Sequence, residues 1–488
     1  MRKALAIFLA LIILGTGCMC YGAAKIIPQR DDVQFTEEII YGQKSAIQGT
    51  EVKIKAEYDN KLHWETTYTP GDQPQTSTEY TYSPVDVDQE CVSKGMLDMN
   101  NYFDIDWGWD DPNNKYPGLN RAYKELVDAT PAGSEKSATI RLKNYEDYYP
   151  IHTIISLPMG EGHFDSETQI YYSRQEENGT VSIEYSLQYL KEFFKIPIID
   201  TESMDLTVFK DEAGNVTTSH SGSSEVGDAY SMYTESVYTH NAGYFTFNTR
   251  TNQGEIIDTS LIPGGYGIYR LPYHHDEDNI VYFKENDISM VYPLDPSVHV
   301  KGLLTDPADE NLLLFTREDT SNFLTVIDIE TMETVQRLDF TYGGPATSMH
   351  NFYVKDDYIV LSTYTEQEEY ITLLTALADG SGIYQLEFSV PFINKELEIK
   401  GIQSTYWRNS STIDAYDWNG SELIMCTTFY DNNSPIYETC GFTLAVYDAS
   451  GIQYLGKYNS SLFTGSGPGS YDYYCHIGDQ KPFEVSWM

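Results

Sequence analysis

The sequence predicts an all-β protein built from repeated four-stranded antiparallel sheets. Its 41 tyrosines and 20 phenylalanines favour strands, because aromatic side chains pack well on pleated, half-buried surfaces. Short strand-like runs alternate with turn residues such as Asn-Gly and Ser-Gly, which tolerate positive φ and mark hairpins. No Pro- or Ser-rich linker divides the chain convincingly, which favours one closed architecture.

The clearest sheet is predicted over residues 412–459. Four strands joined by turns are expected there: Thr412–Trp418, Glu422–Tyr430, Tyr437–Asp448 and Ile452–Tyr458. A four-stranded meander of this size cannot bury both of its apolar faces alone, so it needs neighbours like itself. That requirement predicts the blade of a β-propeller. The same order of strands and turns recurs over Ser348–Val390.

A third stretch carries a resemblance to known propellers. The run Val-Ile-Asp-Ile-Glu-Thr at residues 326–331 resembles the strand-to-turn signature of YVTN- and WD40-like propellers, in which the aspartate closes the turn before the outer strand. The resemblance implies a bacterial extracytoplasmic β-propeller. We expect one propeller over residues 49–488 with about seven four-stranded blades, six and eight being the alternatives. A separate β domain over 49–219, followed by a smaller propeller over 220–488, is the other arrangement left open.

One short helix is predicted to decorate the N-terminal half. Its apolar residues recur with helical spacing and are Leu119, Ala122, Tyr123, Leu126 and Val127. The pair Thr130-Pro131 ends it. The apolar stripe should pack against the sheets.

The N-terminus predicts export. Arg2 and Lys3 precede the apolar run Ala4–Leu14, which is too short to cross a bilayer, so residues 1–24 are interpreted as a signal peptide. Leu14–Cys18 resembles a bacterial lipobox, although Gly15 stands where leucine is usual. The resemblance implies lipidation of Cys18 and anchoring at the outer face of the cell membrane; the alternative is cleavage after Ala24 and secretion. Residues 25–48 are predicted to be a tether.

The other cysteines favour two disulfides in an exported chain. If the hairpin is centred on Asn433, Cys426 lies opposite Cys440, at a separation that a disulfide can span. Two buried thiols, or a register shifted by one residue, are the alternatives. Cys91 and Cys475 would then form the second disulfide, which would link the two ends of the mature chain.

The formal net charge of −42 excludes partners that are polyanions. Such a surface repels nucleic acid and anionic lipid headgroups, so the only membrane contact that we expect is through the lipid anchor. We expect a monomer without a cofactor, whose partner is a protein or a glycan at the cell surface.

One loop is the candidate binding site. Residues 101–114 hold four carboxylates beside two indoles, namely Asp104, Asp106, Asp110 and Asp111 with Trp107 and Trp109. The carboxylates could hold Ca²⁺, although the EF-hand spacing is missing, and the indoles could stack on a sugar ring. A solvated acidic loop with buried indoles is the plainer interpretation. The run His274–Asp278 is a weaker metal candidate, because adjacent strand residues point to opposite faces.

No nucleophile elbow, zinc-protease motif, phosphate loop or dinucleotide fingerprint is present. We therefore favour a surface-tethered, non-enzymatic binding or scaffold module, because propellers vary their loops on a constant frame. A glycan-active hydrolase or lyase with carboxylates at the central channel is the first alternative. An accessory lipoprotein of an envelope complex is the second. No catalytic residue is assigned.

Overall fold

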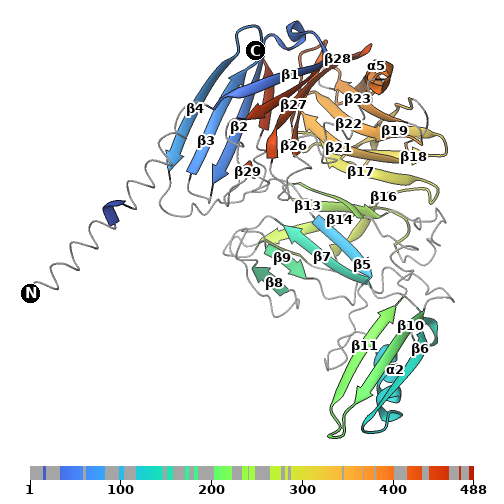
Figure 1. The fold of residues 1–488 in the computed structure, drawn as a ribbon. Coiled ribbons are helices and arrows are strands. Elements are labelled where there is room, and N and C mark those ends of the chain that lie inside the picture. The colour runs from blue at the N-terminus through green and yellow to red at the C-terminus, as the bar shows by residue number, and fades with distance from the viewer. Residues whose placement is uncertain are drawn as a thin grey trace, which may run out of the picture. The chain divides into compact units, whose positions relative to one another are not determined.

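The structure is a computed structural model, and Figure 1 shows its course. It describes residues 15–17, 33–58, 62–82, 98–103, 117–145, 147, 151–157, 171–174, 181–184, 203–222, 234–239, 241–247, 264–275, 281–283, 287–342, 344, 346–366, 368–378, 381–399, 415–430, 439–460, 472–473 and 483–488. These residues form seven antiparallel sheets. The chain divides into two compact units. Unit 1 comprises Met1–Glu90, Thr347–Asp379 and Tyr384–Met488, and unit 2 comprises Cys91–Ala346 and Gly380–Ile383.

Unit 1 contains three of these sheets. The first sheet has the order β1-β28-β27-β26-β25, the second β29-β2-β3-β4 with β30 also on β2, and the third β21-β22-β23-β24. Their bounds are β1 (Phe35–Gly42), β2 (Thr50–Tyr58), β3 (Leu62–Thr69), β4 (Gln75–Tyr82), β21 (Ser348–Lys355), β22 (Tyr358–Tyr364), β23 (Glu369–Ala376), β24 (Tyr384–Pro391), β25 (Ala415–Trp418), β26 (Leu423–Tyr430), β27 (Thr439–Asp448), β28 (Gly451–Ser460), β29 (Asp472–Tyr473) and β30 (Phe483–Trp487), with the 3-10 helix η2 (Lys44–Ile47) and helix α5 (Lys395–Ile399).

Unit 2 contains the other four sheets. Their orders are β5-β7-β9-β8, β11-β10-β6, β12-β13-β14-β15 with β16 also on β14, and β17-β18-β19-β20. The bounds are β5 (Asp98–Phe103), α2 (Pro117–Asp128), β6 (Ser134–Arg141), η3 (Leu142–Asn144), β7 (Ile151–Leu157), β8 (Tyr171–Arg174), β9 (Val181–Glu184), β10 (Ser203–Lys210), β11 (Val216–Gly222), β12 (Thr234–Tyr238), β13 (Ala242–Phe247), β14 (Gly267–His275), β15 (Val281–Phe283), β16 (Ser289–Pro293), β17 (His299–Thr305), β18 (Asn311–Glu318), β19 (Ser321–Asp328) and β20 (Thr334–Asp339).

The predicted fold class is confirmed: the protein is all-β and belongs to the propeller class. Sheets β17–β20, β21–β24 and β25–β28 each follow the order of the chain, as blades do. The sheet β25–β28 buries both of its faces, because strand residues alternate between two cores. Ile424 and Leu444 enter one core and Met425 and Ala445 the other. Its apolar side chains therefore require a neighbour on each side, as the sequence predicted.

The predicted turn chemistry is also confirmed. Asp328 accepts hydrogen bonds from the backbone N–H of Thr331 at 2.7 Å and from its hydroxyl at 2.8 Å. Asp448 accepts the same pair of bonds from Ser450, at 2.7 and 2.6 Å. These hydrogen bonds lower the pKa of Asp328 below its ordinary value. The carboxylate at the end of the third strand thus fixes the turn into the fourth strand in both sheets.

The predicted helix is confirmed as α2. Ala122 and Leu126 are buried, and the helix packs on β6 and β10. Lys210 of β10 donates a hydrogen bond to the carbonyl of Val127, at 3.4 Å. The sheet that carries α2 has three strands among the described residues, in the order β11-β10-β6.

The prediction of a tether over residues 25–48 is wrong from Val33 onward. Residues 35–42 form β1, which pairs with β28 in an antiparallel register from Phe35↔Ser460 to Gly42↔Tyr454. At the other end of the chain, β30 pairs with β2, from Thr50↔Trp487 to Ile54↔Phe483. In Figure 1 the blue strand β1 lies beside the red strand β28. Each end of the chain therefore completes a sheet built mainly from the other end. A division of the chain at residue 219 would separate β2 from β30.

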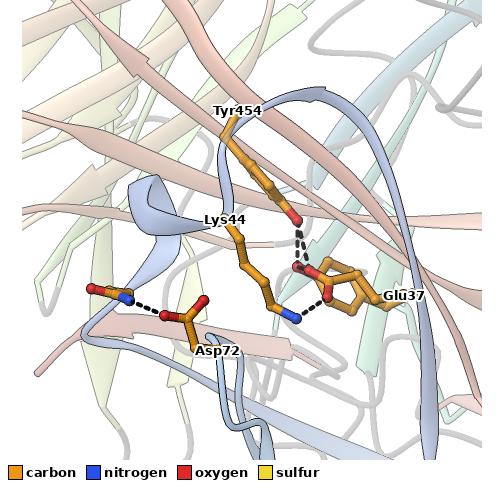
Figure 2. A network of polar contacts seen from close by, with 6 residues as sticks. Glu37, Lys44, Asp72 and Tyr454 are labelled. Carbon is orange, nitrogen blue, oxygen red and sulfur yellow. Dashed lines mark hydrogen bonds and ion pairs between the residues drawn. The ribbon is translucent and has the colours of Figure 1, made fainter.

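A buried polar cluster holds β1 on β28. The Glu37 carboxylate accepts hydrogen bonds from Tyr454 at 2.9 Å and Tyr458 at 3.0 Å, and it forms an ion pair with Lys44. Figure 2 shows Lys44 and Tyr454 directed at Glu37. Burial is the main cause that raises the pKa of Tyr454 and of Tyr458 above the ordinary value. Both hydroxyls therefore keep their protons and donate.

A second carboxylate holds β30. Asp417 at the end of β25 accepts hydrogen bonds from Lys355 at 2.8 Å, from Tyr358 at 3.4 Å and from the backbone N–H of Trp487 at 2.7 Å. Burial lowers the pKa of Lys355, but the hydrogen bond and the charge of Asp417 raise it above its ordinary value overall. Asp417 thus joins three segments that are far apart in the sequence.

The register predicted for the cysteine hairpin is wrong. Cys426 lies opposite Leu444, and the register shifts between Phe429 and Tyr430. Cys440 is four positions from Leu444, or about 13 Å along the strand, which is too far for a disulfide with Cys426. This register does not support the Cys426–Cys440 bridge. Cys426 is buried in the apolar core of unit 1. Cys91 and Cys475 lie outside the described residues, so their pairing stays a prediction, as does the lipidation of Cys18.

Among the described residues, no helix is long and apolar enough to cross a membrane.

Candidate functional site

A cavity of about 300 Å³ lies on one face of the sheet β17–β20 in unit 2. Five of its lining residues are apolar or aromatic and six are polar or charged, so the cavity offers several hydrogen-bonding groups beside its apolar surface. The lining residues are Tyr292, Pro293, Leu294, Asp295, Val298, Leu314, Thr316, Glu318, Thr325, Thr334 and Arg337.

The sheet supplies one wall through strand alternation. Leu314, Thr316 and Glu318 stand at every second position of β18, so their side chains share one face. Thr325 of β19 lies opposite Leu314, and Arg337 of β20 lies opposite Thr325. The register of three strands therefore brings these side chains together.

The segment that joins β16 to β17 supplies the other wall. Asp295 accepts hydrogen bonds from the backbone N–H of Ser297 at 2.8 Å and from its hydroxyl at 2.6 Å. The Tyr266 hydroxyl donates to the carbonyl of Val298 at 3.0 Å. At one side of the cavity, the hydroxyls of Tyr292 and Thr334 are 2.8 Å apart and share a hydrogen bond. These bonds fix the wall before any ligand arrives.

The Thr316 hydroxyl is the unusual group in the lining. Thr316 is 1% exposed, and its Oγ1 has no hydrogen-bond partner among the described residues. Burying a hydroxyl without a partner costs about 1–3 kcal/mol. A buried polar group of this kind requires a reason. The Oγ1 of Thr316 is closed to solvent, so a ligand or water in the cavity would supply the missing hydrogen bond only after a neighbouring side chain moved.

An ion pair stands where the cavity meets solvent. Arg337 pairs with Glu318, and their side chains are 48% and 30% exposed. The guanidinium carbon of Arg337 also lies 4.1 Å from the centre of the Phe323 ring. This stacking fixes the plane of the guanidinium and leaves its remaining N–H groups for other acceptors.

Hydrogen bonds from Ser297 lower the pKa of Asp295, the third charged residue of the lining, below its ordinary value. Asp295 is therefore ionised at neutral pH. One cation and two carboxylates give the lining a formal charge of 1 − 2 = −1.

The binding residues predicted from the sequence fall elsewhere. The predicted residues Asp104, Asp106, Trp107, Trp109, Asp110 and Asp111 lie outside the described residues, so a Ca²⁺ site there stays a prediction. Residues 101–103, predicted as the start of that loop, instead belong to strand β5. His274 and His275 are neighbours on β14, opposite Tyr282 and Val281. Over the described part of the chain, no group of three or more metal-ligating side chains is found.

Sequence reasoning missed the cavity residues. Thr316 follows the apolar run Leu312–Phe315 and looks like an ordinary strand residue. Arg337 is one of only 31 basic residues in the chain. Its position inside a strand was the one local feature that could have marked it as a binding residue. The wall over residues 292–298 reaches the sheet through tertiary contacts that no local pattern indicates.

A second titratable group lies apart from this cavity. Burial raises the pKa of Glu235, on β12, from its ordinary value of 4.5 to about 7, although the charge of Lys301 lowers it. Lys301 is on β17, which packs against β12. A carboxyl group that keeps its proton near neutral pH meets one requirement of a general acid. The glycan-cleaving alternative also needs a second carboxyl group, ionised, as nucleophile or base, and it stays a prediction.

The raised pKa of Glu235 predicts a specific pH dependence. The folded state holds the proton between pH 4.5 and 7 and the unfolded state does not, so this contribution to stability is complete below 4.5 and is lost as the pH rises through 7. Relative to Glu235→Gln, the wild type should lose at most roughly 3 kcal/mol of unfolding free energy over that range. Urea unfolding at several pH values measures this. If the unfolding free energies of the wild type and Glu235→Gln change in parallel with pH, the pKa of Glu235 is not raised in the folded state.

No family model matches the chain, and no curated protein matches it. Solved structures that are similar to it are of the β-propeller type. The β-propeller domain of Cps50 (Swd1) from Myceliophteria thermophila is 10% identical, with 67% of this chain and 87% of that chain covered and a TM-score of 0.25. TolB from Acinetobacter baumannii is 8% identical, with coverages of 90% and 82% and a TM-score of 0.22. A candidate 6-phosphogluconolactonase from Bacteroides fragilis is 7% identical, with coverages of 84% and 95% and a TM-score of 0.30.

The identities and TM-scores are too low for the activities of those proteins to be assigned to this chain. A function is therefore inferred from the cavity and its lining residues.

Proposed function

We propose that the protein is an exported, non-enzymatic binding module of the propeller class, and that the cavity beside β17–β20 holds the group that it recognises on a glycan or a protein. The observation that carries the proposal is the Thr316 hydroxyl, which is buried in the lining without a hydrogen-bond partner among the described residues. A ligand hydroxyl, carbonyl or amide could supply the missing hydrogen bond.

The form of the cavity supports binding. Its volume of about 300 Å³ is at the lower end of the range for small-molecule sites. The wall over residues 292–298 is held by its own hydrogen bonds, so the entropic cost of ordering it when a ligand binds is small. A site of this kind suits one small group of a larger partner.

The sequence supports the location. The predicted signal peptide over residues 1–24, with lipidation of Cys18, would place the module on the outer face of the cell membrane. Cleavage after Ala24 would release it. The net charge of −42 disfavours a polyanionic partner, because like charges repel.

The test compares two threonines of the same kind. Thr246 is also buried and also has a hydroxyl without a partner among the described residues, but it does not line the cavity. Thr316→Val and Thr246→Val should each keep the unfolding free energy or raise it by about 1 kcal/mol, because each removes an unsatisfied polar atom.

Binding should separate the two variants. Ligand-observed NMR is used to screen the purified protein against mixtures of neutral sugars, sugar acids, amino acids and small carboxylic acids. We expect at least one compound to bind the wild type and Thr246→Val, and to bind Thr316→Val at least tenfold more weakly. If every compound behaves alike toward Thr316→Val and the wild type, the cavity is not the binding site.

A further inference from the structure

We propose that the cavity recognises a neutral, polyhydroxylated ring: one uncharged sugar residue at the end of a glycan. This inference rests on the proposed function and names the chemical class of its ligand. Four properties of the lining carry it: its charge, its paired donor and acceptor, its apolar surface and its size.

The charge of the lining disfavours an anion. Arg337 is the one cation among the lining residues, and its charge is already matched by Glu318. Asp295 adds a second carboxylate. An anionic ligand that used the remaining N–H groups of Arg337 would lie beside the Glu318 carboxylate in a lining of net negative charge, which like-charge repulsion makes costly.

The ion pair offers a donor beside an acceptor. A guanidinium carries five N–H donors and a carboxylate has two acceptor oxygens, so the pair of Arg337 and Glu318 leaves groups of both kinds unused. Each sugar hydroxyl both donates and accepts, and two hydroxyls on adjacent ring carbons can meet such a pair together. The Thr316 hydroxyl, which also donates and accepts, would bind a further hydroxyl once a neighbouring side chain moved to open its buried oxygen to the cavity.

Apolar surface lies on both walls beside these polar groups. Leu314 stands on the sheet with Thr316, and Leu294, Val298 and the ring of Tyr292 line the other wall. The hydrogen bond between Tyr292 and Thr334, at 2.8 Å, holds that ring in place. A sugar ring has a face of C–H bonds that packs on aliphatic and aromatic surfaces while its hydroxyls point elsewhere. An amino acid or a small dicarboxylic acid has no such division between an apolar face and a rim of hydroxyls.

The size and exposure limit the ligand to one residue. About 300 Å³ accommodates a single ring with its hydroxyls and not a chain of rings. Because Arg337 is about half exposed, the remainder of a glycan can extend into solvent from the ion pair.

The experiment uses matched neutral and charged sugars. Isothermal titration calorimetry measures the methyl glycosides of glucose, galactose and mannose, and the corresponding uronic acids, against the wild type, Thr316→Val, Thr246→Val and Glu318→Gln. We expect at least one neutral glycoside to bind the wild type and Thr246→Val equally, and its uronic acid to bind the wild type at least tenfold more weakly. Glu318→Gln should remove that discrimination, because it releases Arg337 to pair with the carboxylate.

The outcomes separate this inference from the proposed function. If a uronic acid binds the wild type as well as its neutral partner does, or if only a compound of another class binds and loses affinity in Thr316→Val, the sugar inference is overturned and the binding cavity stands. If no compound of any class distinguishes Thr316→Val from the wild type, both fail. Thermal unfolding of Glu318→Gln, whose side chain is on the surface, checks that the variant is folded.

Discussion

Replacing Asp417 by alanine is expected to lower the free energy of unfolding by about 3 kcal/mol. The change leaves the Lys355 ammonium and the backbone N–H of Trp487 without their acceptor, at distances that are now 2.8 and 2.7 Å. It also removes the hydrogen bond that joins β30 to β25. Urea unfolding followed by circular dichroism measures the loss.

Two further variants define the cause of that loss. Asp417→Asn keeps an acceptor oxygen and removes the charge, so it should lose about half as much. Glu484→Gln changes a carboxylate whose side chain is 60% exposed on the same strand, β30, and should change the free energy by less than about 0.5 kcal/mol. Equal losses for Asp417→Ala and Glu484→Gln would show that Asp417 does not hold the C-terminal strand.

Replacing Glu37 by alanine is expected to loosen β1 and to lower the free energy of unfolding by about 2–3 kcal/mol. The variant leaves two tyrosine hydroxyls and the Lys44 ammonium without their shared acceptor. Hydrogen–deuterium exchange of the amides in β1 measures the loosening. In the wild type, the β1 amides that are directed at β28 should be protected from exchange, because they are bonded in the sheet.

The internal control is in the other unit. Strands β18 and β19 belong to unit 2, so their amides should exchange at the same rate in Glu37→Ala and in the wild type. Tyr454→Phe removes one donor and leaves the carboxylate bonded to Tyr458 and Lys44, and it should have a smaller effect. Fast exchange of β1 in the wild type would restore the interpretation of this segment as a tether.

The strands and turns that the sequence predicted correctly are those fixed by local residues. Asn419-Gly420 ends β25 because Gly420 takes the positive φ of 94° that this turn requires. Asp328 and Asp448 bind residues two or three positions away. Alternation places Ile424 and Met425 in different cores. None of these features depends on a distant part of the chain.

The features that were missed depend on distant partners. Glu37 and Tyr454 are 417 residues apart. The residues of Phe35–Gly42 alone therefore do not predict that this segment pairs with β28. The register of β26 with β27 depends on an irregularity between Phe429 and Tyr430, and a hairpin assumed to be symmetrical about Asn433 could not include it. The cavity needs both a sheet face and the wall over residues 292–298.

A crystal structure of the protein soaked with the neutral glycoside of highest affinity would show whether the cavity is the binding site. We expect one sugar ring in the cavity beside β17–β20, with a hydroxyl oxygen at a hydrogen-bonding distance of about 2.8 Å from Thr316 Oγ1. Two further hydroxyls should contact Arg337 and Glu318. An empty cavity with the sugar bound elsewhere on the protein would contradict this expectation.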